Sequence, residues 1–363
     1  MREWLHRLWP RRRPPIKRAL ALAGGGVIGG MYEVGTLAAL DETLPGFRAN
    51  DFDIFVGTSS GSVVASIIAN GITPADLYRV IDLEIPDPMN LQKGHVFDGR
   101  AARRAIGNFG RLFWAVGKQI VTSFRFSIPD ILSKAQESLP AGFFSLEQLE
   151  GFMRRLFEAK GLSNDFRNVP RTLLIPAVDL DRAERVVFGL GPLAEVPISQ
   201  AIAASSAIPG FFEPCTVGGR DYVDGGVGYV AHADLAIEMG AELVVVINPL
   251  VPLIEREENG QRHLKTRGLY SVLEQSSRIT SQHVLEMGLR ELQSLHPKVE
   301  ILLIQPDAGE PLLFGPSMGF ESSRPALRYG YTSTKAWLDG AGTAFRRRFS
   351  IGPALRLPVR SSA

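Results

Sequence analysis

The sequence has a single cysteine, Cys215, in 363 residues. One cysteine cannot form an intramolecular disulfide, so a reducing compartment is expected, and we predict a cytoplasmic protein. Long hydrophobic runs are also missing: no apolar stretch reaches the roughly 20 residues of a membrane-spanning helix. Residues 19–23 follow several basic residues but stop at three glycines, which is too short for a signal peptide. They predict a buried first strand instead.

Charge of one sign is not in excess. The 40 lysine and arginine residues nearly balance 38 acidic ones, for a net charge of +2. Nucleic acid is not an expected partner, because it would require a basic excess or a basic face. Only the ends are strongly basic, and we predict tails over residues 1–16 and 341–363. The first tail also holds Trp4 and Trp9, so it is either disordered or contacts an anionic membrane surface.

Between the tails, predicted strands alternate with predicted helices, which indicates one α/β domain over residues 17–340. The apolar content of 45% is enough for a large core. Residues 85–141 interrupt the alternation and are predicted to form a helical insertion. Within it, a helix over 99–120 combines basic and aromatic residues, so it either lies on lipid, covers a cleft as a lid, or docks as an ordinary helix.

The stretch 54–71 predicts a buried strand, a sharp turn and a helix of small residues. The turn reads Gly57-x-Ser59-x-Gly61, the pattern of a nucleophile elbow, in which a Cβ at either glycine would collide with its neighbours. Ser59 would then stand at a helix N-terminus, where the helix dipole stabilises negative charge. The alternative is a plain Ser/Gly-rich turn.

The first predicted strand leads into a second glycine-rich turn over residues 24–30. Gly24, Gly26 and Gly29 match the dinucleotide fingerprint, but that site also needs an acidic residue at the end of the second strand. Here the second strand leads to Ser59. Adjacent parallel strands place their C-terminal loops side by side, so an oxyanion hole for Ser59 explains both turns.

A serine nucleophile needs a base. None of the six histidines stands in a glycine-rich turn after a strand, and His232 and His283 fall in predicted helices. Asp224 ends a predicted strand and is followed by Gly225 and Gly226, so it is the alternative base. Asp-Gly is also a common turn pair. A histidine triad and a Ser-Asp dyad both remain open at this point.

Four motifs in order resemble those of the patatin-like phospholipases, over roughly residues 17–249. They are Gly24-Gly25-Gly26-x-x-Gly29, Gly57-x-Ser59-x-Gly61, Ala204-Ser205-Ser206-Ala207-Ile208-Pro209 with Phe212-x-Pro214, and Asp224-Gly225-Gly226. Four ordered motifs are far more specific than one. The resemblance implies an α/β three-layer sandwich with a central, mostly parallel sheet.

The resemblance also implies roles for individual residues. Ser59 would be the nucleophile and Asp224 its dyad partner. The oxyanion hole would be formed by backbone N–H groups of Gly24, Gly25, Gly26 and Val27, and the motif glycines would be Gly29, Gly57, Gly61, Gly225 and Gly226. One departure is visible, because Ile28 stands where many members have a basic residue.

The implied activity is hydrolysis of carboxylic esters of membrane lipids through an acyl-enzyme, as in a phospholipase A or lysophospholipase, with no metal or organic cofactor. The expected partner is a lipid presented at a membrane surface, with the protein peripheral on the inner face. The competing hypotheses are a Ser-His-Asp carboxylesterase and a non-catalytic lipid-binding or scaffolding protein on a hydrolase fold. The motifs specify neither the head group nor the oligomeric state.

Overall fold

The computed structural model describes residues 16–96, 141–254, 263–314 and 319–349, and its centre is one sheet of eight strands. The strands are β1 (Arg18–Leu22), β2 (Ile54–Gly57), β3 (Thr172–Asp179), β4 (Glu184–Phe188), β5 (Cys215–Val217), β6 (Arg220–Asp224), β7 (Leu243–Ile247) and β8 (Glu300–Ile304). Their order is β5-β6-β3-β2-β1-β7-β8, and β4 pairs with β3. The run from β3 to β8 is parallel, whereas β4, β5 and β6 pair antiparallel.

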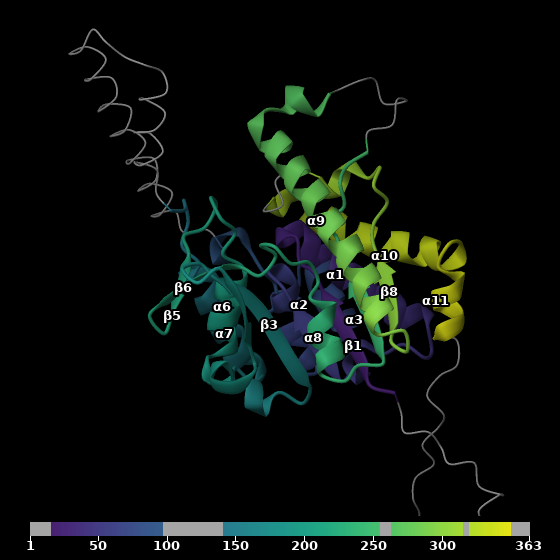
Figure 1. Ribbon diagram of the computed structural model, residues 1–363, viewed down its shortest axis with the longest axis horizontal. Helices are drawn as coiled ribbons and strands as arrows, with labels where there is room; N and C mark the ends of the chain where they lie inside the picture. Colours follow the sequence, from purple (N-terminus) through teal and green to yellow (C-terminus); the bar gives the residue numbers. More distant parts are fainter. Residues whose placement is uncertain (1–15, 97–140, 255–262, 315–318, 350–363) are drawn as a thin grey trace, which may run out of the picture.

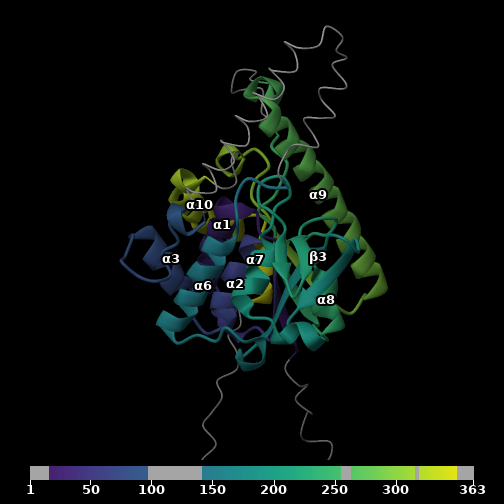
Figure 2. The same ribbon diagram turned by 90° about the vertical axis from the view of Figure 1, so that its left-hand side faces the viewer.

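Helices cover both faces of the sheet, as Figures 1 and 2 show. They are α1 (Gly26–Thr43), α2 (Ser60–Ala69), α3 (Pro74–Asp82), α6 (Glu147–Lys160), α7 (Ile198–Ser205), α8 (Ala233–Glu238), α9 (Leu269–Leu295), α10 (Ser323–Asp339) and α11 (Thr343–Arg348). In Figure 2, α1, α3, α6 and α10 lie on one side and α8 and α9 on the other. The predicted three-layer α/β sandwich with a mostly parallel sheet is therefore confirmed.

The strand pattern explains the two layers, because successive side chains of a strand point to opposite faces. In β1, Leu20 and Leu22 join the larger core beneath α1, α2 and α6. Ala19 and Ala21 join the smaller core beneath α8 and α9. Both sets are fully buried, as expected for parallel strands covered on each side.

The predicted tails and the predicted insertion are only partly covered by the described residues. Residues 1–15 and 97–140, which include most of the basic N-terminal tail and the helical insertion, lie outside the described residues. The predicted C-terminal tail begins too early, because α11 lies within it. Phe345 and Phe349 of this segment are buried, and both rings pack against Phe47. The folded domain therefore includes residues 341–349.

No helix in the described ranges is long and apolar enough to cross a membrane. The longest of them, α9, has charged and polar residues along its length.

The crossing of α1 and α10 depends on glycine. A Cβ at Gly330 would overlap the carbonyl oxygen of Tyr32 in α1. We predict that Gly330→Ala lowers the free energy of unfolding by about 1–3 kcal/mol, because overpacking forces the two helices apart. Urea unfolding followed by circular dichroism measures this.

Gly288 in α9 is the matched control, because a Cβ there meets no atom within 4 Å. Gly288→Ala should raise stability by about 0.5–1 kcal/mol through the better helix propensity of alanine. Equal effects of the two substitutions would contradict the proposed importance of this crossing.

Candidate active site

The two glycine-rich turns lie side by side because β1 and β2 are parallel neighbours. Leu22 at the end of β1 is in register with Gly57 at the end of β2. The turns then pack directly on each other: a Cβ on Gly61 would lie 2.5 Å from the carbonyl oxygen of Leu22. The Gly57–Gly61 turn is equally tight, with 2.6 Å between a Cβ on Gly57 and the carbonyl oxygen of Gly61. These close approaches explain why both positions are glycine.

Ser59 has the strained backbone of a nucleophile elbow. Its φ is 52° and its ψ is −128°, and it directly precedes the first residue of α2. A non-glycine residue in such a conformation costs on the order of 1–3 kcal/mol and persists only where its surroundings hold it in place. Its side chain is almost fully buried but lines two cavities.

Ser205 at the end of α7 holds this elbow. The backbone N–H of Ser59 donates to Ser205 Oγ at 3.0 Å, and the Ser205 hydroxyl donates to the carbonyl of Pro176 in β3 at 2.7 Å. The carbonyl of Ser205 accepts from the N–H of Gly225 at 3.3 Å. One residue thus connects the elbow, the sheet and the turn after β6.

Asp224 is brought next to Ser59. Its N–H donates to the carbonyl of Ala207 at 2.9 Å, and Gly226 N–H donates to its carboxylate at 2.7 Å. Burial raises the pKa of Asp224 to about 6, although the hydrogen bonds from Gly226 and the Ser59 side chain oppose this rise. Gly225 must be glycine because a Cβ would overlap the carbonyl of Pro176. A carboxylate with this pKa is a stronger base than an ordinary aspartate.

The turn after β1 offers backbone donors beside Ser59. Gly24, Gly25 and Gly26 have φ values of 80°, 130° and 64°, which favour glycine, and α1 begins at Gly26. At the start of a helix the first N–H groups have no intrahelical acceptor. Within the described part of the chain, the N–H groups of Gly25, Gly26 and Val27 donate to no protein acceptor. They remain available for an oxyanion.

The N–H of Gly24 does not join the predicted oxyanion hole. Its N–H donates to Glu33 Oε1 at 2.9 Å, so it is not available to an oxyanion. Glu33 is fully buried, and burial raises its pKa to about 8. Gly29 supports the turn in another way, because a Cβ there would lie 2.8 Å from the carbonyl oxygen of Gly24. Ile28, which stands where many members of the resembled family have a basic residue, is buried in the core.

His232 precedes the first residue of α8, and its side chain contacts two other segments. Its Nε2 lies 2.9 Å from the carbonyl of Gly225, and Arg185 donates to its Nδ1 at 3.3 Å. Arg185 in turn pairs with Asp234 at 2.6 Å. Burial lowers the pKa of His232, which keeps the ring neutral. Since Nδ1 accepts from Arg185, we assign the proton to Nε2, which then donates to Gly225.

None of the histidines in the described ranges hydrogen-bonds to Ser59 or Asp224. His232 instead supports the turn that carries Asp224. No local pattern around His232 predicts this supporting role, because its partners come from β4 and from the turn after β6. The described residues also contain no group of three side chains that could bind a metal ion.

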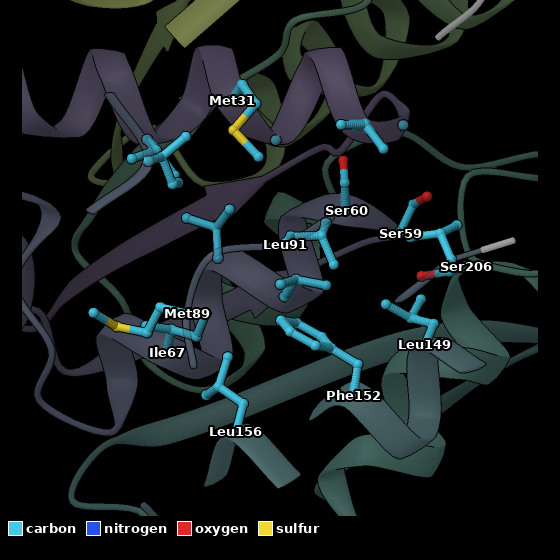
Figure 3. Close-up of a pocket in the computed structure, with 18 of the residues that line it drawn as sticks. Met31, Ser59, Ser60, Ile67, Met89, Leu91, Leu149, Phe152, Leu156 and Ser206 are labelled. Atoms are coloured by element: carbon cyan, nitrogen blue, oxygen red, sulfur yellow. The ribbon is translucent and has the colours of Figure 1, made fainter. Parts of the chain in front are cut away.

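An apolar cavity opens at Ser59 (Figure 3). Its walls come from α1, α2, α3 and α6, so it extends from Ser59 between these helices. In Figure 3, Ser59, Ser60 and Ser206 lie at one end, and Ile67, Met89 and Leu156 lie away from them. Nearly all other lining side chains are aliphatic or aromatic. The cavity therefore suits an extended hydrocarbon group whose head lies at Ser59.

Together these features define an α/β protein with a serine at a nucleophile elbow beside a buried aspartate. The chain belongs to the patatin-like phospholipase family, whose family model matches residues 20–237. The family expected from the four motifs is thus confirmed.

Two curated relatives are similar over part of their length. The chain is 22% identical over 229 residues to "Probable lipid hydrolase 463L" of Invertebrate iridescent virus 6, covering 62% of this chain and 65% of that protein. It is 29% identical over 213 residues to "Uncharacterized protein YqhO" of Bacillus subtilis (strain 168), covering 56% and 62%. The chain therefore spans less than two thirds of the length of either relative.

Two solved structures are also similar. VipD from Legionella pneumophila aligns with a TM-score of 0.39 at 18% identity, covering 90% of this chain and 67% of that chain. The type III effector protein ExoU aligns with a TM-score of 0.38 at 16% identity, covering 90% and 53%.

The bonds of Ser205 generate a prediction. Ser205→Ala leaves the N–H of Ser59 and the carbonyl of Pro176 without partners in a buried place. We expect a loss of about 1–3 kcal/mol in unfolding free energy, measured by urea denaturation. Labelling of Ser59 by a fluorophosphonate probe should also slow, because the elbow is less well held.

The neighbouring Ser206 is the control. Its buried hydroxyl has no hydrogen-bond partner among the described residues, so Ser206→Ala should leave stability unchanged or slightly raised. A neutral Ser205→Ala, or a loss of the same size in Ser206→Ala, would show that the bonds of Ser205 do not support the elbow.

Proposed function

We propose that this protein is a serine lipid acyl hydrolase of the phospholipase A or lysophospholipase type. Membership in the patatin-like phospholipase family supports a lipid acyl hydrolase activity. The observation that carries the proposal is the cavity that opens at Ser59 and is lined almost wholly by apolar side chains. A non-lipid ester would leave most of this hydrophobic surface unused.

In the proposed mechanism, Ser59 Oγ attacks the ester carbonyl while Asp224 accepts the hydroxyl proton. The tetrahedral oxyanion is stabilised by the N–H groups of Gly25, Gly26 and Val27 and by the N-terminal end of α2. The C–O bond to the alcohol then breaks, and Asp224 returns the proton to the leaving oxygen. Water attacks the resulting acyl-enzyme, with Asp224 again as the base, and the fatty acid is released.

The lipid would be met at a membrane surface. Support comes from the first turns of α9, which project beyond the sheet in Figures 1 and 2. Leu269 and Leu273 are 73% and 59% exposed, and Tyr270 is also exposed. Exposed apolar side chains grouped at a projecting end are typical of a surface that enters a lipid interface.

The dyad predicts distinct results for two variants. A fluorophosphonate probe should label Ser59 in the wild type, with no labelling in Ser59→Ala. Asp224→Asn should label at least about 100-fold more slowly, because loss of a general base costs on the order of 10²–10⁴ in rate. Peptide mass spectrometry locates the adduct.

The pH profile gives an independent check on Asp224. It accepts a proton only when ionised, so the labelling rate should fall as the pH drops through about 6. His232→Gln can keep a donor to the carbonyl of Gly225 but has no titratable ring, so the fall near pH 6 should persist in this variant if Asp224 is the base. An inert wild-type protein that is properly folded would instead favour the non-catalytic lipid-binding hypothesis.

The cavity predicts a dependence on acyl length. Turnover of p-nitrophenyl esters should improve as the chain grows from butyrate to palmitate, because each buried CH₂ contributes about 0.8 kcal/mol. Leu156→Trp, at the end of the cavity away from Ser59, should remove the advantage of the long chains and leave butyrate hydrolysis unchanged.

Leu295→Trp is the control, since this leucine lies on the surface at the end of α9. An unaltered chain-length profile in Leu156→Trp would place the acyl group elsewhere.

A further inference from the structure

A second cavity meets the apolar one at Ser59, and its walls are chemically different. Both cavities include Gly26, Ser59 and Ile208 in their linings. The second is bounded on one side by the turn that carries Asp224. Its opposite wall is α9. Asp224 lines only this second cavity of the two.

The α9 wall is polar. It presents Glu274, Ser277, Arg278 and Ser281, which are spaced i, i+3, i+4 and i+7 and therefore share one side of the helix. Ser277 is exposed and Ser281 half-buried, so both hydroxyls can donate to and accept from a bound molecule. The second cavity therefore suits a group that makes hydrogen bonds.

Arg278 does not make this wall cationic. The guanidinium is 3% exposed, and its Nε donates to Glu274 at 2.8 Å. Its two other nitrogens donate to the carbonyls of Val251 at 3.1 Å and Leu313 at 2.7 Å. The charge is thus neutralised by Glu274, and the side chain joins α9 to two loops. Among the described residues that line this cavity, it is the only cationic side chain.

From these observations we propose that the second cavity binds the alcohol part of the substrate, and that it takes an uncharged, hydroxyl-bearing alcohol, the glycerol of a monoacylglycerol, in preference to a phosphate-bearing one. The proposal rests on the proposed lipid acyl hydrolase activity and narrows it, because phospholipid and lysophospholipid esters would then be cleaved more slowly than a monoacylglycerol. The position of Asp224 supports it, since the group that returns the proton must face the departing alcohol oxygen.

Charge explains the preference. A phosphate in this cavity would be desolvated near the carboxylates of Asp224 and Glu274, with a guanidinium that is already paired. Like charges brought together out of water are unfavourable, whereas a polyol loses only hydrogen bonds that Ser277 and Ser281 can replace.

The test compares three substrates with the same acyl chain in mixed micelles: monoacylglycerol, lysophosphatidylcholine and lysophosphatidate. We expect kcat/KM to be highest for monoacylglycerol and at least about tenfold lower for lysophosphatidate, the change that 1.4 kcal/mol produces. An equal rate, or a preference for lysophosphatidate, would overturn the proposal.

A gain of function tests the location. Ser277→Lys adds an unpaired cation at the α9 wall and should raise the relative rate on lysophosphatidate about tenfold. Ser294→Lys adds the same charge to an exposed serine at the other end of α9 and should leave the ratio unchanged. An equal shift in both variants would point to general attraction to the micelle, and no shift in Ser277→Lys would place the head group elsewhere.

Hydrolysis of p-nitrophenyl butyrate separates the two levels of inference. If the protein cleaves this ester but shows no head-group preference, only the alcohol site is wrong. If it cleaves no ester and Ser59 is not labelled, the proposed function is wrong, and the alcohol site falls with it.

Discussion

The hydrogen bonds of Ser205 hold the candidate active site together. Its hydroxyl accepts from Ser59 and donates to Pro176 in β3, and its carbonyl accepts from Gly225. The two turns it joins are separated by about 165 residues in sequence, and both are conformationally demanding. An elbow with a positive φ at serine would relax without such support. The small-residue end of α7 therefore matters as much for the geometry of the site as the serine itself.

Three buried titratable residues surround this site, and burial shifts the pKa of each toward the neutral form. Glu33, with a pKa of about 8, is mostly protonated at pH 7 and holds the turn at Gly24. His232 is neutral and holds the turn at Gly225. Asp224, with a pKa of about 6, stays mostly ionised at pH 7 and is the one hydrogen-bonded to Ser59. All three residues are buried, but their hydrogen-bond partners differ. Glu33 and His232 bind backbone groups and support the turns, whereas Asp224 binds the Ser59 hydroxyl and is the candidate base.

Much of the fold could be predicted from the sequence, because apolar strands and small-residue helices are local patterns. The elbow at Ser59 and the turn at Asp224 are local as well, each bounded by glycines. The roles of Ser205 and His232 could not be read in this way, since their partners come from distant segments. The N–H of Gly24 was also assigned wrongly, because it donates to Glu33, about two turns into α1. Local chemistry predicts which residues react, and tertiary packing decides which groups support them.

In the proposed mechanism the two cavities would bind the two parts of a lipid on either side of its ester bond, and α9 would connect this site to a membrane. Its exposed Leu269 and Leu273 lie about three and about two turns before Ser281, and the rise from Leu273 to Ser281 is roughly 12 Å at 1.5 Å per residue. A fatty chain moved through water would lose about 0.8 kcal/mol per CH₂, so transfer is feasible only from one apolar medium directly into another. The proposed arrangement would meet that requirement, because the apolar cavity starts at Ser59 and the exposed leucines of α9 would contact the lipid interface. The alcohol would exchange its bound water for the polar wall of α9, so only the chain would need to leave the bilayer.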